Sequence, residues 1–164
     1  MITKFSKMPL KTNVLRTKGL ASVQGAMFGM TRNGGTRAHQ GIDLATDEGY
    51  RVYAVEDAKV VAIATGTDAY GFIVNLKLDC PTKKELHNRF AFYAHLDRID
   101  VKVGQVVKAG KQIGLSGDTG NAKGMTSVEK GGHLHFEIRT RQVTGKGLAN
   151  RIDPLPFINL STEP

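Results

Sequence analysis

Short runs rich in β-branched residues, separated by glycine-containing turns, dominate the pattern of apolar and polar positions. They lie at 51–66, 71–79, 89–97, 102–117 and 133–140. Strands at this spacing, bounded by Gly, Asp and Asn, are typical of an antiparallel sheet or sandwich and not of alternating βαβ units. No window of a dozen residues shows a convincing 3.6-residue period, so little helix is expected. The pattern therefore predicts a mainly β fold.

The two ends of the chain depart from this pattern. Residues 1–26 are weakly patterned, which predicts an extended N-terminal segment that wraps a single domain formed by residues 27–164. The tail at 153–164 holds three of the five prolines and is expected to close the domain as an extended segment. A chain of 164 residues is long enough to build one hydrophobic core without disulfides.

The run "GGHLHFEIR" (131–139) has a polar side that packing does not require. In a strand successive side chains alternate between faces. One face is apolar and is formed by Leu134, Phe136 and Ile138. The other face carries His133, His135, Glu137 and Arg139. Because the apolar set is complete on its own, the histidine face is either plain solvent surface or a functional site.

Composition narrows the function classes only in part. A net charge of +8 favours polyanionic partners such as nucleic acid, acidic lipid headgroups or an anionic cell-wall polymer. The single cysteine, Cys80, excludes an internal disulfide and a cysteine-based zinc cluster, and we interpret it as structural. No stretch approaches the ~20 apolar residues of a membrane span, so stable membrane insertion is not expected. The N-terminus lacks the apolar core of a secretory signal.

Four of the five histidines lie in distinctive settings. His39 precedes Asp43 by four residues, and Gly41 between them lets the backbone turn so that the two side chains converge. His95 ends the strand predicted at 89–97, where regular alternation places Tyr93 on the same face. His133 and His135 come from a third, distant segment. The fifth histidine, His87, lies in a polar stretch and is expected to be an ordinary solvated residue.

Two imidazoles and one carboxylate with a fourth position open form the ligand set of a catalytic zinc site. Imidazole and carboxylate without thiolate fit zinc better than a hard-cation site. A structural zinc normally has four protein ligands, often cysteines, so the histidines point toward chemistry.

Four segments together resemble the lysostaphin/LytM zinc metallopeptidases, which cleave peptide cross-links in bacterial cell walls. They read "RNGGTRAHQGIDLAT", "FYAHLDRI", "VKAGKQIGLSGDTG" and "GGHLHFEIR", and "MFGMTRNGG" is similar to the F-G-x-R entry of that family. The resemblance covers residues 27–155. It rests on H-x-x-x-D, Y-x-H and H-x-H in that order.

The resemblance implies Zn²⁺ as cofactor and a role for each site residue. His39, Asp43 and His135 would bind the metal, while His95 and His133 would be catalytic residues that do not ligate it. The spacing alone does not say which histidine of H-x-H is the ligand. We favour His133 as general base and His95 as oxyanion stabiliser, with an exchange of the two roles left open. Tyr93 would orient the substrate or His95.

One departure from the family concerns the segment before the H-x-H strand. The loop 120–132, "GNAKGMTSVEKGG", is longer than the usual short turn. It is expected to change the substrate groove and leave the metal site intact. The bond cleaved is expected to be D-alanyl–diaminopimelate, with glycyl–glycine as the alternative.

The expected setting is the bacterial cell wall. A chain with this N-terminus is expected to act on peptidoglycan in the periplasm after delivery by a phage or a secretion system. A delivery machinery or an inhibitor protein is then an expected partner. The sequence carries no oligomer signal, so a monomer is the default.

Three other readings compete with a peptidase. The first is a non-catalytic relative that activates another wall hydrolase, which the presence of all five site residues disfavours. The second is a biotinyl or lipoyl carrier, suggested by the rhythm of "VKVGQVVKAGKQIG", but the lysine motif of such carriers is missing. The third is nucleic-acid binding, for which the chain has neither an aromatic stacking platform nor a basic helix.

Overall fold

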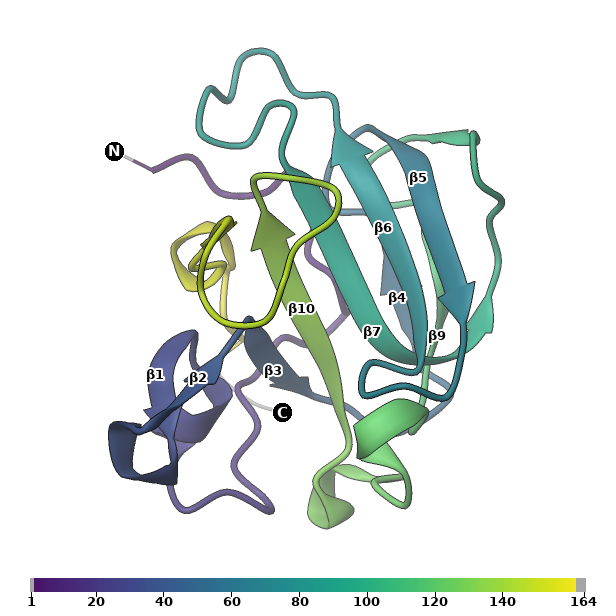
Figure 1. The fold of residues 1–164 in the computed structure, drawn as a ribbon. Helices are drawn as coiled ribbons and strands as arrows, with labels where there is room; N and C mark the ends of the chain where they lie inside the picture. The colour runs from purple at the N-terminus through teal and green to yellow at the C-terminus, as the bar shows by residue number, and fades with distance from the viewer. Residues whose placement is uncertain (1, 162–164) are drawn as a thin grey trace.

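The computed structural model describes residues 2–161 and is built mainly of β-strands (Figure 1). The strands are β1 (Gly29–Arg32), β2 (Arg37–His39), β3 (Ile42–Ala45), β4 (Arg51–Tyr53), β5 (Ala58–Thr65), β6 (Phe72–Leu78), β7 (Phe90–Ile99), β8 (Val106–Val107), β9 (Gln112–Ser116), β10 (His133–Arg139) and β11 (Arg151–Ile152). Short 3₁₀ turns complete it: η1 (Val23–Ala26), η2 (Asn33–Gly35), η3 (Gly120–Ala122), η4 (Val128–Lys130) and η5 (Leu155–Phe157). The predicted mainly β fold with little helix is confirmed.

All strand pairings are antiparallel, as the sequence predicts. A nine-stranded sheet runs in the order β11-β10-β7-β6-β5-β8, and β3, β4 and β9 join it through β10 and β7. Strands β1 and β2 form a separate two-stranded sheet that lies beside β3 (Figure 1). Strand β10 pairs with β3, β7 and β11, so it holds a central position in the fold.

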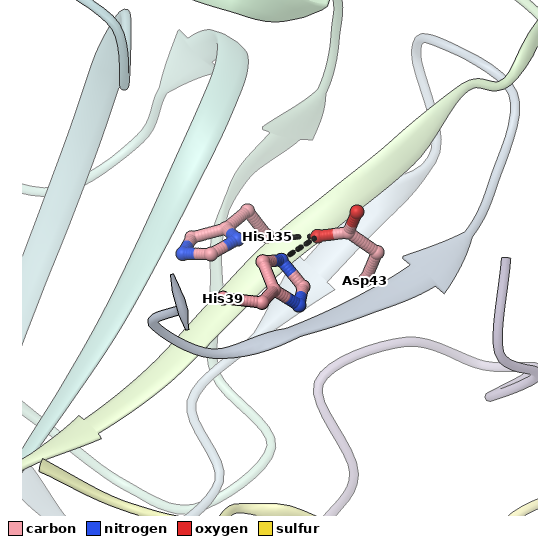
Figure 2. A group of neighbouring side chains, drawn as sticks. All are labelled: His39, Asp43 and His135. Carbon is pink, nitrogen blue, oxygen red and sulfur yellow. Dashed lines mark hydrogen bonds and ion pairs between the residues drawn. The ribbon is translucent and has the colours of Figure 1, made fainter. Parts of the chain in front are cut away.

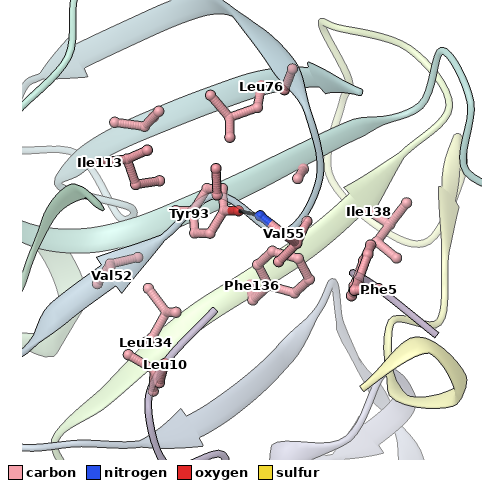
Figure 3. Packing of buried hydrophobic residues seen from close by; sticks show 14 of the residues in the cluster. Phe5, Leu10, Val52, Val55, Leu76, Tyr93, Ile113, Leu134, Phe136 and Ile138 are labelled. Atoms are coloured by element: carbon pink, nitrogen blue, oxygen red, sulfur yellow. Dashed lines mark hydrogen bonds between the residues drawn. The ribbon is translucent and has the colours of Figure 1, made fainter. Parts of the chain in front are cut away.

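The hydrophobic core lies against the apolar face of β10 (Figure 3). Its predicted members Leu134, Phe136 and Ile138 are fully buried. The Phe136 ring packs edge-on against Tyr93, with ring centroids 5.1 Å apart, and against Phe5 at 5.8 Å. Burial of one such aromatic side chain contributes about 2–3 kcal/mol to stability. The alternation read from the sequence therefore fixes which side of β10 faces the core.

The N-terminal segment packs against the rest of the chain and shares its core. Phe5, Leu10 and Leu15 are all buried there. The Phe5 amide donates to the Phe157 carbonyl at 3.0 Å, and Leu15 forms a β-bridge with Leu44 of β3. This segment therefore reaches the strand that carries Asp43.

Two residues singled out by the sequence lie away from the histidine face. Cys80 is buried, and burial raises the pKa of its thiol to about 11, so the thiol stays protonated at neutral pH. His87 accepts a hydrogen bond from the Cys80 amide at its Nδ1 atom, at 3.1 Å. Between residues 2 and 161, no helical segment has the length and apolar character needed to cross a membrane.

Candidate metal centre

Three neighbouring strands bring His39, Asp43 and His135 together. His39 ends β2, Asp43 lies in β3 and His135 lies in β10, where it is the direct cross-strand partner of Asp43. Gly41 makes the turn from β2 into β3 possible, because a Cβ atom there would lie 2.3 Å from the Phe136 carbonyl oxygen. Any larger residue at this position would push β3 away from β10. The predicted convergence of these three side chains is therefore present in the structure.

The three side chains meet at one oxygen atom of Asp43 (Figure 2). Asp43 Oδ1 lies 3.0 Å from His39 Nε2 and 3.1 Å from His135 Nδ1. The three possible ligand atoms lie within 4.8 Å of one another, and all three residues are buried. A single ion can therefore contact one atom from each.

His39 and His135 each make one hydrogen bond on the side of the ring that faces away from Asp43. These outer hydrogen bonds determine which ring nitrogen is left with a free lone pair toward Asp43. His39 Nδ1 lies 2.9 Å from the Met27 carbonyl oxygen, and His135 Nε2 lies 2.7 Å from Glu137 Oε2. Both partners accept hydrogen bonds, so these nitrogens carry the protons. In the neutral form that metal binding requires, the rings present His39 Nε2 and His135 Nδ1 as acceptors toward the position of Asp43 Oδ1. A cation between three acceptors satisfies all of them, and this donor set fits zinc.

Two arginines fix the other oxygen of Asp43. Arg16 Nη1 lies 3.2 Å and Arg32 Nη2 2.9 Å from Asp43 Oδ2. Burial raises the pKa of the Asp43 carboxyl, but His133 and the hydrogen bonds of His135 and His39 outweigh burial and hold this pKa well below its usual range. Asp43 is therefore ionised, and Oδ1 is the oxygen left for a metal.

Glu137 anchors the far side of His135 and is completely buried. Its Oε2 atom accepts hydrogen bonds from His135 Nε2 and from the Tyr70 hydroxyl, each at 2.7 Å. Burial raises its pKa, but His135 and Arg139 outweigh burial and hold the pKa far below the usual range. Burial likewise lowers the pKa of His135, yet Asp43 and Glu137 together raise it to about 9. The negative charges of Asp43 and Glu137 therefore favour positive charge at the His135 ring, whether from a proton or from a bound cation.

His95 and His133 form a second pair beside this centre, with ring centroids 5.0 Å apart. The Nδ1 atom of each ring lies 2.8 Å from a backbone carbonyl oxygen, that of Thr119 for His95 and that of Gly131 for His133. These bonds place a proton on Nδ1 and leave Nε2 as the free lone pair. Burial, with the neighbouring histidines, lowers the pKa of His95 to about 3, and burial also lowers the pKa of His133. Both rings are therefore neutral at neutral pH.

The expected role of Tyr93 in the site is wrong. Tyr93 is fully buried in the core, and its hydroxyl accepts a hydrogen bond from the Val55 amide at 3.2 Å (Figure 3). Regular alternation is broken next to it, because His95 adopts a left-handed backbone with φ of 61°. The pairing of β7 with β6 and with β9 shifts register around this point. His95 thus turns to the site while Tyr93 faces the core.

A different tyrosine lies at the site. The Tyr70 ring centroid is 5.5 Å from that of His135, and its hydroxyl accepts a hydrogen bond from Gln40. Tyr70 and Gln40 line a cleft of about 1380 Å³, whose wall also includes His39, Asp43, His95, His133 and His135. Met125, from the long 120–132 loop, lines the same cleft. The loop therefore borders the cleft, and its Met125 sulfur accepts a hydrogen bond from Arg16 at 3.8 Å.

Sequence reasoning missed four residues of this centre. They are Arg16, Arg32, Tyr70 and Glu137. Glu137 carried a signal, since alternation puts it on the face of His133 and His135, and Arg32 lies in "MFGMTRNGG", the segment similar to the F-G-x-R entry of the family. Arg16 and Tyr70 reach the site from distant segments, and no local pattern marks them.

Comparison with known proteins identifies the family of the chain. The model of peptidase family M23 matches residues 37–150. The chain is 37% identical over 103 residues to the peptidoglycan DD-endopeptidase ShyB of Vibrio cholerae. The aligned region covers 63% of this chain and 21% of ShyB. It is 33% identical over 126 residues to the glycyl-glycine endopeptidase ALE-1 of Staphylococcus capitis, covering 77% of this chain and 30% of the relative.

A third relative has a name of a different kind. The murein hydrolase activator NlpD of Salmonella dublin is 32% identical over 133 residues, covering 80% of this chain and 28% of NlpD. The chain thus spans between 21% and 30% of the length of these three curated relatives.

Solved structures share the fold. The catalytic domain of the antimicrobial peptidase lysostaphin from Staphylococcus simulans superposes with a TM-score of 0.58 at 27% identity, covering 94% of this chain and 87% of that one. A zinc-containing peptidase from Vibrio cholerae gives a TM-score of 0.63 at 28% identity, and the match covers 98% of this chain and 41% of the peptidase chain.

Proposed function

The chain belongs to peptidase family M23, and we propose that it is a zinc-dependent endopeptidase that hydrolyses peptide cross-links of bacterial peptidoglycan. One observation carries the proposal: His39, Asp43 and His135 direct three acceptor atoms at one point inside a cleft. Two further neutral imidazoles stand beside that point. Zinc, the catalytic role and the substrate are supported by this arrangement together with the names of the relatives.

The ligand atoms are assigned from the outer hydrogen bonds. His39 Nε2, Asp43 Oδ1 and His135 Nδ1 would hold the zinc ion. Bound zinc supplies a Lewis acid and lowers the pKa of a coordinated water toward ~7. Arg16 and Arg32 keep Asp43 in place, and Glu137 keeps the His135 ring in the required tautomer.

His133 and His95 are proposed as the catalytic pair. His133 Nε2 lies 3.7 Å from Asp43 Oδ2, which places its lone pair beside the carboxylate whose other oxygen is the proposed ligand. A neutral imidazole there accepts a proton from the attacking water as general base. His95, whose ring lies 6.1 Å from that of His135, faces the same space and is proposed to stabilise the oxyanion. That role requires a proton on Nε2, which either ring gains only by becoming an imidazolium. Because His95 and His133 have the same hydrogen bond from Nδ1 to a backbone carbonyl oxygen, the two roles stay interchangeable.

The substrate proposed is a D-alanyl–diaminopimelate cross-link in peptidoglycan. The name of ShyB, a peptidoglycan DD-endopeptidase, supports a bond between two D-centres, whereas the name of ALE-1 gives the glycyl–glycine alternative. The net charge of +8 attracts the protein to anionic wall polymers in a salt-sensitive manner. The proposed place of action is therefore the periplasm or the cell wall.

Digestion of purified cell walls tests this function. We expect zinc-loaded protein to release D-alanyl–diaminopimelate fragments from directly cross-linked walls, identified by mass spectrometry. Glycyl–glycine products from bridged walls would instead support the alternative bond. His135→Ala, prepared in parallel, should release neither product. If wild-type protein with bound zinc releases no peptide from either wall, the endopeptidase proposal fails.

The name of NlpD raises a second candidate, a non-catalytic activator of another wall hydrolase. The five side chains of the proposed catalytic centre are all present here and face one cleft, which favours the enzyme. An activator would stimulate an added wall hydrolase equally well as wild type and as His133→Ala. The enzyme would lose its own hydrolysis in that variant.

A further inference from the structure

A second cavity lies behind Tyr70, next to the metal centre. It measures about 340 Å³, and its lining includes Gln40, Tyr70, Phe92, Arg139, Lys146 and Arg151. Gln40, Tyr70 and Lys146 also line the larger cleft, so the two spaces share a wall. A substrate held in the cleft can therefore extend a group toward this cavity.

Arg139 is the buried group that faces this cavity. The residue is 6% exposed, and its guanidinium lies over the Phe92 ring, with Cζ 3.7 Å from the ring centroid. Its Nε atom donates to Glu137 Oε1 at 2.8 Å. Within residues 2–161, neither Nη atom of Arg139 has a hydrogen-bond partner. A stacked guanidinium with two free Nη atoms is typical of a site that binds a planar anion.

The charges around the cavity do not cancel. Arg139 and Arg151 both donate through Nε to the same oxygen of Glu137, at 2.8 Å each. Arg151 is further held by the carbonyl oxygens of Gly145 and Gly147, and Lys146 adds a third positive charge at the rim. These three cations face Glu137 and one acidic lining residue, Asp68, whose Oδ1 accepts the Gly71 amide at 3.1 Å. Lys146 and Asp68 are exposed, so among the buried groups two guanidiniums share one carboxylate, and the excess buried positive charge would be stabilised by an opposite partner.

We propose that this cavity is a subsite for a carboxylate of the substrate peptide, with the free Nη atoms of Arg139 as its ligands and Lys146 at its entrance. This inference rests on the proposed function and specifies its substrate class. The Tyr70 ring lies 5.5 Å from the His135 ring and 5.6 Å from Arg139 Cζ, so the subsite is a few residues of extended peptide or less from the metal centre.

The position of this subsite selects among cell-wall cross-links. In a D-alanyl–diaminopimelate cross-link, the carbon bonded to the scissile nitrogen carries a free carboxylate. A glycyl–glycine bridge carries none near the scissile bond. The stem that follows the cleaved bond also ends in a free carboxylate, a few residues further on. The subsite therefore favours cross-links in which the stem after the cleaved bond carries free carboxylates, and it disfavours the same cross-link when they are amidated.

Two synthetic cross-linked peptides test the subsite directly. They share one D-alanyl–diaminopimelate bond and differ only in whether the carboxyls of the stem that follows it are free or amidated. For the full zinc-loaded chain we expect kcat/KM for the free acid to exceed that for the amide at least about tenfold, since charged hydrogen bonds discriminate by this much. Calorimetric Kd values for the two peptides, measured with the zinc-loaded His133→Ala variant, should follow the same order.

Single-residue variants test which side chains make the protein distinguish the free-acid peptide from the amidated one. Arg139→Gln should bring the ratio of the two kcat/KM values close to one. Because both peptides are measured on one preparation, the ratio is independent of zinc content, which the loss of the Glu137 contact would alter. Lys146→Met, on an exposed loop, should lower the ratio about threefold without threatening the fold. Arg141→Gln removes an exposed arginine that lies two residues after Arg139, and it should leave the ratio at the wild-type value.

The outcomes distinguish a failure of the carboxylate subsite from a failure of the proposed endopeptidase function. Equal cleavage of both peptides by wild type overturns the carboxylate subsite and leaves the endopeptidase intact. An unchanged ratio in both Arg139→Gln and Lys146→Met also overturns this subsite. If neither peptide is cleaved, the proposed function fails on this substrate, and equal Kd values would then overturn the subsite as well.

Discussion

His135 Nε2 lies 2.7 Å from Glu137 Oε2, two residues further along the same strand. One face of β10 thus supplies both a proposed zinc ligand and the carboxylate that orients it. Glu137 is itself held by Tyr70, Arg139 and Arg151. The alternation of a β-strand is sufficient to place ligand and support side by side.

Replacement of Glu137 tests this support. Glu137→Gln keeps the shape but weakens the acceptor for His135 Nε2 and leaves Arg139 and Arg151 without a carboxylate. We expect zinc affinity, measured by competition with a chromogenic chelator, to fall about 10–100-fold. Glu129→Gln, at an exposed glutamate, should leave the affinity unchanged. Wild-type affinity in the folded Glu137→Gln protein would show that Glu137 does not support the metal site.

The catalytic pair is tested by separating metal binding from turnover. His133→Ala should retain zinc, since His133 is not in the ligand set, and should lose about 10²–10⁴-fold in kcat because the general base is gone. Zinc is measured by elemental analysis and turnover with a cross-linked wall peptide. His87→Ala, far from the cleft, is the matched control. Near wild-type turnover by His133→Ala would remove His133 from the mechanism.

Two tyrosine variants test the correction of the site. Tyr93→Phe removes the hydroxyl that accepts the Val55 amide in the core. It should cost about 1 kcal/mol in the free energy of unfolding and leave kcat unchanged. Tyr70→Phe removes a donor to Glu137 and should weaken zinc binding severalfold. A drop in kcat for Tyr93→Phe at unchanged zinc content would contradict the structural role of Tyr93.

The core beneath β10 makes a prediction about stability alone. Phe136 is fully buried between Phe5 and Tyr93, so Phe136→Ala should lower the free energy of unfolding by about 3–5 kcal/mol. Urea denaturation followed by circular dichroism measures this change. Phe90→Ala, at a partly exposed position on β7, should cost clearly less. Equal losses for the two variants would mean that the core is not centred on β10.

Local pattern was sufficient for the mainly β fold and marked the histidine face of β10, whereas the choice of His135 as ligand came from the family resemblance. Period-two alternation predicted that Leu134, Phe136 and Ile138 face the core, because the pleat of a strand acts over neighbouring residues only. The same rule failed at Tyr93, since the left-handed backbone of His95 reverses the alternation there. Nothing in the residue types near His95 signals that turn.

Two supporting residues, Arg16 and Tyr70, were beyond local pattern. Arg16 comes from the weakly patterned N-terminal segment and reaches Asp43 only because Leu15 pairs with Leu44 of β3. Tyr70 approaches Glu137 from the loop before β6. Such contacts depend on the tertiary arrangement of segments, which spacing in the sequence does not encode.

Zinc content per chain is the most direct test of the central claim, that His39, Asp43 and His135 jointly hold one catalytic ion. Elemental analysis of protein exposed to zinc and then desalted should find one zinc per wild-type chain. His135→Ala should retain none, while His133→Ala should still retain one. A folded wild-type chain without zinc, or a His135→Ala chain that keeps it, would contradict the account.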